Sequence, residues 1–142
     1  MQALHEKQSF LIVGLLFRRQ ILTDEIILMN TLERRSFVRL TSFLQEGQLT
    51  VALTGEIDHH CAKNYICSIE SKVEAYNPKV CVLDFTDVTF MDSSGIAVVI
   101  NAMRAVGRLN GKLMVCGLRE QPMKVFRASG INKLIEIKEG VT

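Results

Sequence analysis

The sequence predicts an α/β fold, in which a mixed β-sheet carries helices packed mainly on one face. Short apolar runs rich in β-branched residues alternate with longer segments whose apolar residues recur at helical spacing. Glycine, asparagine and proline separate these segments. This alternation is typical of sheets whose strands are connected by helices. Right-handed crossovers place the long helices on the same face.

The first elements of this pattern are two strands and a helix. FVRLTSFL (37–44) and LTVALTGEI (49–57) flank the turn residues QEGQ, which predicts a hairpin with a half-buried second strand. Apolar residues between Ala62 and Tyr76 then recur at helical spacing, and an Asn-Pro pair ends the helix. We expect Asp58, in the polar loop before it, to cap this helix.

The central strand is predicted at VCVLDF (80–85), a continuous apolar run of the kind found in strands that are covered on both faces. TDVTFMDSSG leads out of it. The remaining predicted elements are a helix over 96–106 ended by Asn110-Gly111, a strand at 112–118, a short helix (MKVFRAS) ended by Gly130, and a last strand at 134–137.

Length and composition limit the function classes. A chain of 142 residues with 48% hydrophobic content is suited to one compact domain. Its net charge of +2 comes from 17 basic and 15 acidic residues scattered in both signs, which argues against a nucleic-acid surface. The four cysteines show no C-x-x-C spacing, and Cys81 and Cys116 lie in apolar runs, so a reducing compartment is expected.

The N-terminal segment stands apart from this domain. SFLIVGLLF (9–17) is too short to span a bilayer, which takes about 20 residues. Arg18 and Arg19 stand where a signal peptide would need small residues for cleavage. We expect an extra helix or a disordered tail over residues 1–28, and we divide the chain into an extension (1–35) and a domain (36–142).

The hydroxyl pair in FMDSSG (90–95) is the main functional candidate. Ser93 and Ser94 fall between the central strand and the next helix, where ligands and modifications meet α/β sheets. One interpretation is helix capping by Asp92 or Ser93. Another is phosphorylation of a serine, because a helix N-terminus stabilises added negative charge. Gly95 would then let a partner backbone approach closely.

Two further interpretations involve the EIDHH loop (56–60). A serine hydrolase would use Ser93 as nucleophile, His59 or His60 as base and Asp58 as the orienting acid, but the sequence has no G-x-S-x-G elbow. A metal site would combine this loop with the nearby carboxylates Asp84 and Asp87. Adjacent histidines are expected to point in different directions, which disfavours that site.

Four segments together resemble one family. They are LTGEIDHH (53–60), VCVLDFTDVTFMDSSGIAVVI (80–100), GKLMVCGL (111–118) and VFRASGINKLIEI (125–137), and they are similar to the STAS domain of anti-sigma factor antagonists. The resemblance runs from about residue 36 to residue 142. Within the family, D-H-H after G-E favours the sporulation members over the stress-response members.

The resemblance implies a protein-binding switch and no enzymatic activity. Ser93 would be phosphorylated by a partner that is both anti-sigma factor and serine kinase. The unphosphorylated form would bind the ADP-loaded partner and release a sporulation sigma factor, and a serine phosphatase would reverse the modification. The implied partner-binding residues are Glu56, Asp58, His59, His60, Asp92, Ser93, Ser94 and Gly95.

The same resemblance implies a cytoplasmic protein with no cofactor or metal of its own, because ATP and ADP belong to the partner kinase. Neither direct nucleic-acid binding nor membrane association is expected. Two alternatives stay open. One is a STAS module with another partner, such as a stress-response regulator or a transporter subunit, and the other is a small serine hydrolase.

Overall fold

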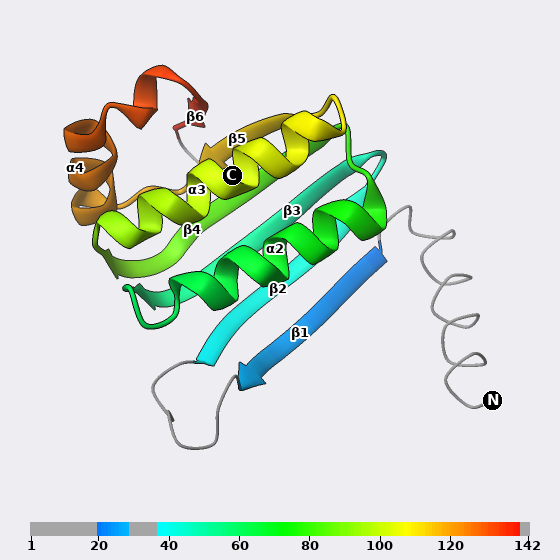
Figure 1. Ribbon diagram of the computed structural model, residues 1–142, viewed down its shortest axis with the longest axis horizontal. Coiled ribbons are helices and arrows are strands. Elements are labelled where there is room, and N and C mark those ends of the chain that lie inside the picture. Colours follow the sequence, from blue (N-terminus) through cyan, green and yellow to red (C-terminus); the bar gives the residue numbers. More distant parts are fainter. Residues whose placement is uncertain (1–19, 29–36, 140–142) are drawn as a thin grey trace.

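The computed structural model describes residues 20–28 and 37–139, with side chains described from residue 39 onward. It confirms the predicted α/β fold with a mixed sheet. Figure 1 shows two long helices lying across one face of the sheet. The elements are β1 (Gln20–Leu28), β2 (Phe37–Gln45), β3 (Gln48–Ile57), α2 (Ala62–Tyr76), β4 (Val80–Met91), α3 (Ser93–Arg108), β5 (Lys112–Cys116), α4 (Glu120–Ser129), a 3-10 turn (Ile131–Lys133) and β6 (Glu136–Lys138).

The strands follow the order β1-β2-β3-β4-β5-β6 across the sheet. β1, β2 and β3 are antiparallel neighbours, whereas β3, β4, β5 and β6 run parallel. Parallel strands end at the same edge of a sheet, so the loops after β3 and β4 are neighbours. Their last paired residues are Glu56 with Phe90 and Ile57 with Met91. This edge brings the two polar loops of the sequence together.

The predicted hairpin is confirmed. β2 and β3 pair up to Gln45 and Gln48, and the turn between them has positive φ at both Glu46 (49°) and Gly47 (81°). Two positive φ angles are typical of the two-residue turn that matches the twist of paired strands. The predicted ends of two helices are also confirmed, because Asn77 and Gly130 adopt the left-handed conformation that ends α2 and α4.

The core lies between the sheet and its helices. β3 contributes Leu49, Val51 and Leu53, which are fully buried and alternate along the strand as predicted. Phe85 of β4 meets Phe126 of α4 edge to face, with ring centroids 5.6 Å apart. The helices supply further fully buried residues to the same cluster, among them Ile69, Val73, Val98, Val99 and Val106.

Strand β1 departs from the prediction for the N-terminal segment. A helix or disordered tail was expected over residues 1–28, and for Gln20–Leu28 this is wrong. β1 pairs antiparallel with β2 and forms an edge of the sheet. Its sequence, QILTDEIIL, is rich in the β-branched residues that suit strands. The prediction for SFLIVGLLF (9–17) lies outside the described residues.

Strand β4 is longer than predicted. VCVLDF was expected to end at residue 85, but the strand continues to Met91. The register against β3 shifts between Ala52 and Thr54, so the polar residues after Asp84 lie at a bulge in the strand pairing. The Asp84 carboxylate accepts the Thr86 N–H (2.9 Å) and hydroxyl (2.6 Å) there. Pairing resumes afterwards, so DSSG follows directly from a strand.

Candidate functional site

The two loops at the carboxyl edge of β3 and β4 are joined by a hydrogen bond. The Asp92 N–H donates to the Ile57 carbonyl oxygen at 3.2 Å. The EIDHH loop (56–60) and the start of α3 are therefore one continuous surface of the molecule. Of the implied partner-binding residues, Glu56, His59, His60 and Ser93 are exposed, Asp58, Asp92 and Ser94 are half-buried, and Gly95 is buried.

The loop between β4 and α3 contains the residue that caps the helix. Asp92 is the cap, because its extended backbone precedes the helix and its Oδ1 accepts the Ser94 N–H at 2.7 Å. Ser93 is the first residue of α3 and is exposed. Within the part of the chain that the structure describes, its hydroxyl makes no hydrogen bond. That hydroxyl is available to a partner at the positive end of the helix.

Gly95 serves the interior of the molecule. It is buried, and a side chain there would overlap the end of Met91, a fully buried residue. A Cβ at position 95 would also lie 3.1 Å from the Met91 Cβ. The missing side chain thus lets β4 and the first turn of α3 pack closely. This differs from the expected close approach of a partner to the Gly95 backbone.

The loop between β3 and α2 is closed by Asp58. Its Oδ1 accepts the N–H groups of His60 (2.9 Å) and Cys61 (3.2 Å). The residue directly before α2 is Cys61, which makes no side-chain capping bond. The expected capping bonds of Asp58 are present one turn earlier, and its carbonyl oxygen also accepts the Ala62 N–H at 3.0 Å. Its side chain therefore acts on a backbone turn that precedes α2.

The thiol of Cys61 ties the same loop from inside. It donates towards the carbonyl oxygens of Glu56 (3.3 Å) and Asp58 (3.6 Å). Burial raises the pKa of this thiol to about 11, so it stays protonated and remains a donor at neutral pH. For Asp58, slight burial alone would raise the pKa, but hydrogen bonds from Cys61 and His60 outweigh it and lower the pKa. Asp58 is therefore a carboxylate at neutral pH.

The two histidines do not complete a catalytic triad. Their rings were expected to point in different directions, and this is wrong, because the centroids lie 3.9 Å apart at 39°. Asp58 accepts backbone N–H groups and no imidazole N–H in the described structure. No described hydrogen bond connects Ser93 with His59 or His60. The geometry that a serine nucleophile needs is not assembled.

The described residues also contain no group of three or more histidine, cysteine, aspartate or glutamate side chains positioned to hold a metal ion. Asp84, which was considered as a ligand, is hydrogen-bonded to Thr86 within β4. All four cysteines are free, and Cys81 and Cys116 are buried as predicted. No helix within the described ranges is long and apolar enough to cross a membrane.

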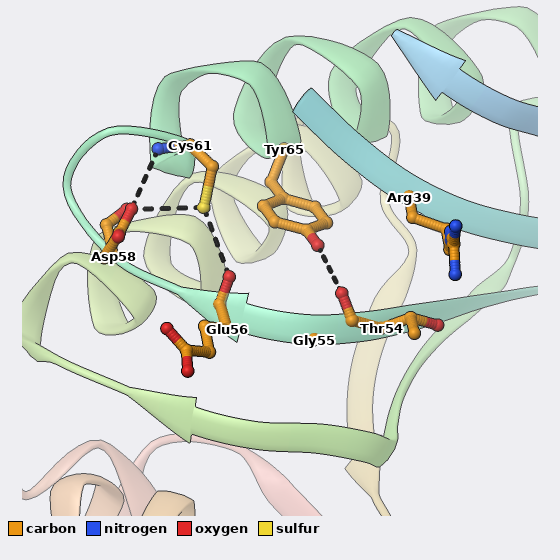
Figure 2. Close-up of a pocket in the computed structure, with 7 residues that line it drawn as sticks. All are labelled: Arg39, Thr54, Gly55, Glu56, Asp58, Cys61 and Tyr65. Atoms are coloured by element: carbon orange, nitrogen blue, oxygen red, sulfur yellow. Dashed lines mark hydrogen bonds between the residues drawn. The ribbon is translucent and has the colours of Figure 1, made fainter. Parts of the chain in front are cut away.

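A pocket of about 490 Å³ opens beside the EIDHH loop. Figure 2 shows Tyr65 of α2 reaching across it to β3, where its hydroxyl donates to the Thr54 carbonyl oxygen at 2.9 Å. Burial raises the pKa of Tyr65 to about 12, so it remains a donor. The pocket presents both acidic and basic side chains. Its lining residues are Arg39, Thr54, Gly55, Glu56, Asp58, Cys61 and Tyr65.

Two residues beside the site were missed by the sequence analysis. Phe90 is 42% exposed and lies next to Glu56 in the sheet register. The alternating pattern of TDVTFM would have predicted an outward-facing Phe90 if the predicted strand had been extended through these residues. Gln121 of α4 binds the backbone of Met91 through its side-chain amide. No local pattern indicates that contact, because 30 residues separate the two partners.

Comparison with known proteins identifies the family. The STAS domain model matches residues 44–142. The chain belongs to the STAS domain family. The STAS sequence is 28% identical to an anti-sigma F factor antagonist of Paenibacillus polymyxa, over 64% of this chain and 78% of the relative. It is 29% identical to an anti-sigma-B factor antagonist of Listeria monocytogenes, over 63% of this chain and 78% of the relative.

The STAS fold is also found by comparison of structures. The unphosphorylated form of the anti-sigma factor antagonist SpoIIAA superposes with a TM-score of 0.56 at 21% sequence identity. The match covers 73% of this chain and 89% of SpoIIAA. The predicted resemblance to the STAS domain of anti-sigma factor antagonists is therefore confirmed in both sequence and fold.

Proposed function

We propose that this STAS domain is an anti-sigma factor antagonist that is switched by phosphorylation of Ser93. The unphosphorylated domain binds an anti-sigma factor that is also a serine kinase, and a sporulation sigma factor is released. The observation that carries the proposal is the exposed hydroxyl of Ser93 at the start of α3. The relatives named anti-sigma F and anti-sigma-B factor antagonists support it.

The start of α3 suits a phosphoacceptor. Asp92 already supplies the side-chain cap, so modification of Ser93 does not remove a capping bond from the helix. The N-terminal end of a helix carries partial positive charge, which stabilises a phosphate at its first residue. The modified domain is therefore expected to keep its fold. The effect of the phosphate falls on what binds to this surface.

The surrounding surface explains how a phosphate would act as a switch. Glu56 and Asp58 already place carboxylates on this edge, and Phe90 adds an exposed apolar side chain beside Glu56. A partner that packs here must remove water from Ser93. Phosphorylation adds about −1.5 to −2 charge, which makes that desolvation costly and adds like-charge repulsion against acidic groups. Binding is lost while the domain itself is unchanged.

The chemistry of the switch belongs to the partners. The kinase partner supplies ATP for the modification and holds ADP when it binds the antagonist, and a serine phosphatase restores the hydroxyl of Ser93. The domain acts in the cytoplasm as a regulator, and the arrangement of Ser93, His59 and His60 supports this over hydrolysis. In this proposal the pocket beside Asp58 belongs to the docking surface.

The first experiment locates the phosphate. Purified protein is incubated with the anti-sigma kinase encoded in the same genome and ATP, and modified peptides are identified by mass spectrometry. We expect one phosphate on Ser93, and none on a Ser93→Ala variant. Ser94→Ala is the matched control, because Ser94 is adjacent and half-buried, and its backbone N–H, which bonds Asp92, is retained.

Phosphorylation that persists in Ser93→Ala, or that is abolished equally in both variants, would contradict the assignment of Ser93. No phosphorylation of the wild type by a kinase that modifies its own known antagonist would contradict the proposed function. Cleavage of an activated ester that depends on Ser93 would favour a hydrolase instead.

The second experiment measures affinity for the ADP-loaded kinase by calorimetry. We expect Ser93→Ala to bind as well as the unmodified wild type and to stay bound when ATP is added. Ser93→Asp is expected to bind at least about tenfold more weakly, because one buried uncompensated charge costs more than 1.4 kcal/mol. Tighter binding by Ser93→Asp would show that the partner surface attracts negative charge, contrary to this switch.

The identity of the sigma factor has a second candidate. The two relatives differ in their named targets but share almost the same identity with this chain, 28% and 29%. The D-H-H stretch at 58–60 favours the sporulation partner, whereas the anti-sigma-B relative favours an anti-sigma-B factor. Competition between the two kinds of anti-sigma factor for one sample of the protein distinguishes them, because only the cognate partner should bind in the presence of the other.

A further inference from the structure

We propose that Gln121 of α4 is a positioning residue that sets the geometry of Ser93, so that α4 and the phosphoacceptor move together. The inference rests on the proposed function for its role in phosphorylation, but its structural part stands on contacts within the domain. Figure 1 shows α4 at the end of the sheet where α3 begins. Neither the sequence pattern nor the family resemblance assigned a role to this residue.

Gln121 binds the backbone of Met91 with both ends of its amide group. The Met91 N–H donates to Oε1 at 2.9 Å, and Nε2 donates to the Met91 carbonyl oxygen at 2.8 Å. This pair of bonds reproduces what a neighbouring strand would offer to one residue. A side chain is here used as a strand partner.

The end of β4 needs such a partner. β5 accompanies β4 only as far as the pair Asp84 and Cys116. From there to Met91, the described strands give β4 a neighbour only on the β3 side. The Nε of Arg119 donates to the Thr86 carbonyl oxygen at 2.8 Å, near the start of this protruding segment. Gln121 holds its far end, so the N-terminal end of α4, from its cap residue Arg119 to Gln121, braces β4 at two points.

Contacts beyond Met91 transmit its position to Ser93. The Met91 side chain is fully buried and fills the space beside Gly95, in the first turn of α3. The next residue, Asp92, caps that turn through the Ser94 N–H. A shift of the Met91 backbone therefore moves the helix cap and the first helical residue, which is Ser93. The path from Gln121 to Ser93 consists of the two hydrogen bonds to Met91, the packing of Met91 beside Gly95 and the cap bond from the Ser94 N–H to Asp92.

The test compares two variants of α4. Gln121→Met keeps the length of the side chain and removes both hydrogen bonds. Lys124→Ala is the matched control on the same helix, because Lys124 is exposed and its contact is an exposed ion pair with Glu120 (3.4 Å). Two readouts are taken. Amide hydrogen exchange at Met91 and the amide chemical shift of Ser93 need no partner, and kcat and KM for phosphorylation of Ser93 need the kinase.

We expect hydrogen exchange at the Met91 amide to be at least about tenfold faster in Gln121→Met, because the Met91 N–H loses its acceptor, Gln121 Oε1. The chemical shift of the Ser93 amide should also change. The kcat for phosphorylation is expected to fall about ten- to hundredfold, as misplaced reacting groups do. KM should change less, since the exposed docking residues are retained. Lys124→Ala should match the wild type in every readout.

Wild-type exchange at Met91, an unmoved Ser93 amide or an unchanged kcat in Gln121→Met would overturn the proposal. If this variant does not fold, Gln121→Glu replaces it, because the carboxylate still accepts the Met91 N–H but cannot donate to its carbonyl oxygen. An effect of Gln121→Glu that is intermediate between the wild type and complete loss supports the positioning role of Gln121. Wild-type behaviour of Gln121→Glu overturns that role. Absence of phosphorylation in the wild type itself would overturn the proposed function, and the exchange and chemical-shift results would then decide the structural part alone.

Discussion

The two loops at the carboxyl edge of the sheet are held in different ways. The loop between β3 and α2 is stabilised by its own residues, because Asp58 and Cys61 bond groups that lie at most five positions away. The loop between β4 and α3 also has a local cap, Asp92. Its start, however, is fixed by Gln121, which lies 30 residues further along the chain.

This difference matches the roles that we propose for the loops. A self-contained turn presents Glu56, Asp58 and the histidines as a preformed surface for a partner. A phosphoacceptor has to fit a kinase active site as well as a docking surface, so its position must be fixed more closely. Bracing by α4 gives the Ser93 loop an anchor from a distant side chain, whereas the side-chain bonds described for the EIDHH loop are all local. Substitutions that break each anchor should therefore have effects of different size.

The largest effect is expected at Gly95. In Gly95→Val the new side chain overlaps Met91, which is fully buried and cannot swing into solvent. We expect a loss of about 2–3 kcal/mol in the free energy of unfolding, as overpacked cores show. Urea unfolding followed by circular dichroism measures this loss.

Gly107→Val is the control for Gly95→Val. Gly107 lies in the same helix, and a Cβ there has no heavy atom within 4 Å. We expect a change of no more than about 0.5 kcal/mol, because valine and glycine differ little in helix propensity. Equal losses in the two variants would show that the helix itself resists valine and that the contact with Met91 is unimportant.

A smaller difference is expected between the two loop carboxylates. Asp92→Ala removes the side-chain cap of α3 and should cost about 1 kcal/mol. Asp58→Ala should cost less, because the Cys61 thiol also stabilises this loop by donating to the carbonyl oxygens of Glu56 and Asp58. Urea unfolding of both variants at neutral pH gives the comparison. A larger loss for Asp58→Ala would mean that the β3–α2 loop depends on its carboxylate more than the geometry indicates.

The self-contained features of this fold were the ones that the sequence could predict. The QEGQ turn, the helix ends at Asn77 and Gly130 and the half-buried strand β3 depend on nearest neighbours and periodicity, and all are confirmed. Local chemistry was sufficient for these elements. That the two polar loops share one surface was implied only by the family resemblance, and the structure explains it because the parallel strands β3 and β4 end at one edge.

Features that depend on distant contacts were missed or misassigned. β4 seemed to end at polar residues, because a bulge against β3 hides the continuing pattern up to Met91. Gly95 was assigned to the surface, although its neighbour Met91 fills the space inside. Gln121 had no local signal at all. Strand β1 was overlooked because a strongly apolar segment precedes it, and its pairing with β2 is not encoded in its own periodicity.

The smallest expected effect tests the thiol that ties the β3–α2 loop. Burial raises the pKa of Cys61 from an ordinary value of 9.0 to about 11. A folded-state pKa above the unfolded value means that stability is fully present below pH 9 and is lost as pH rises from 9 towards 11. Buried Cys81, with its pKa raised to about 12, and Cys116, with its pKa raised to about 11, contribute to the same alkaline loss. Only a difference between variants isolates Cys61.

Unfolding free energies at pH 8 and pH 10 provide that difference. Cys61→Ala should be less stable than the wild type at pH 8, because the bonds to Glu56 and Asp58 are lost. Between pH 8 and pH 10 the wild type should lose more stability than the variant, since only the wild type carries the ionisable thiol at this position. Equal losses would show that Cys61 ionises as readily in the folded loop as in the unfolded chain, and the thiol would then be no structural tie of the docking surface.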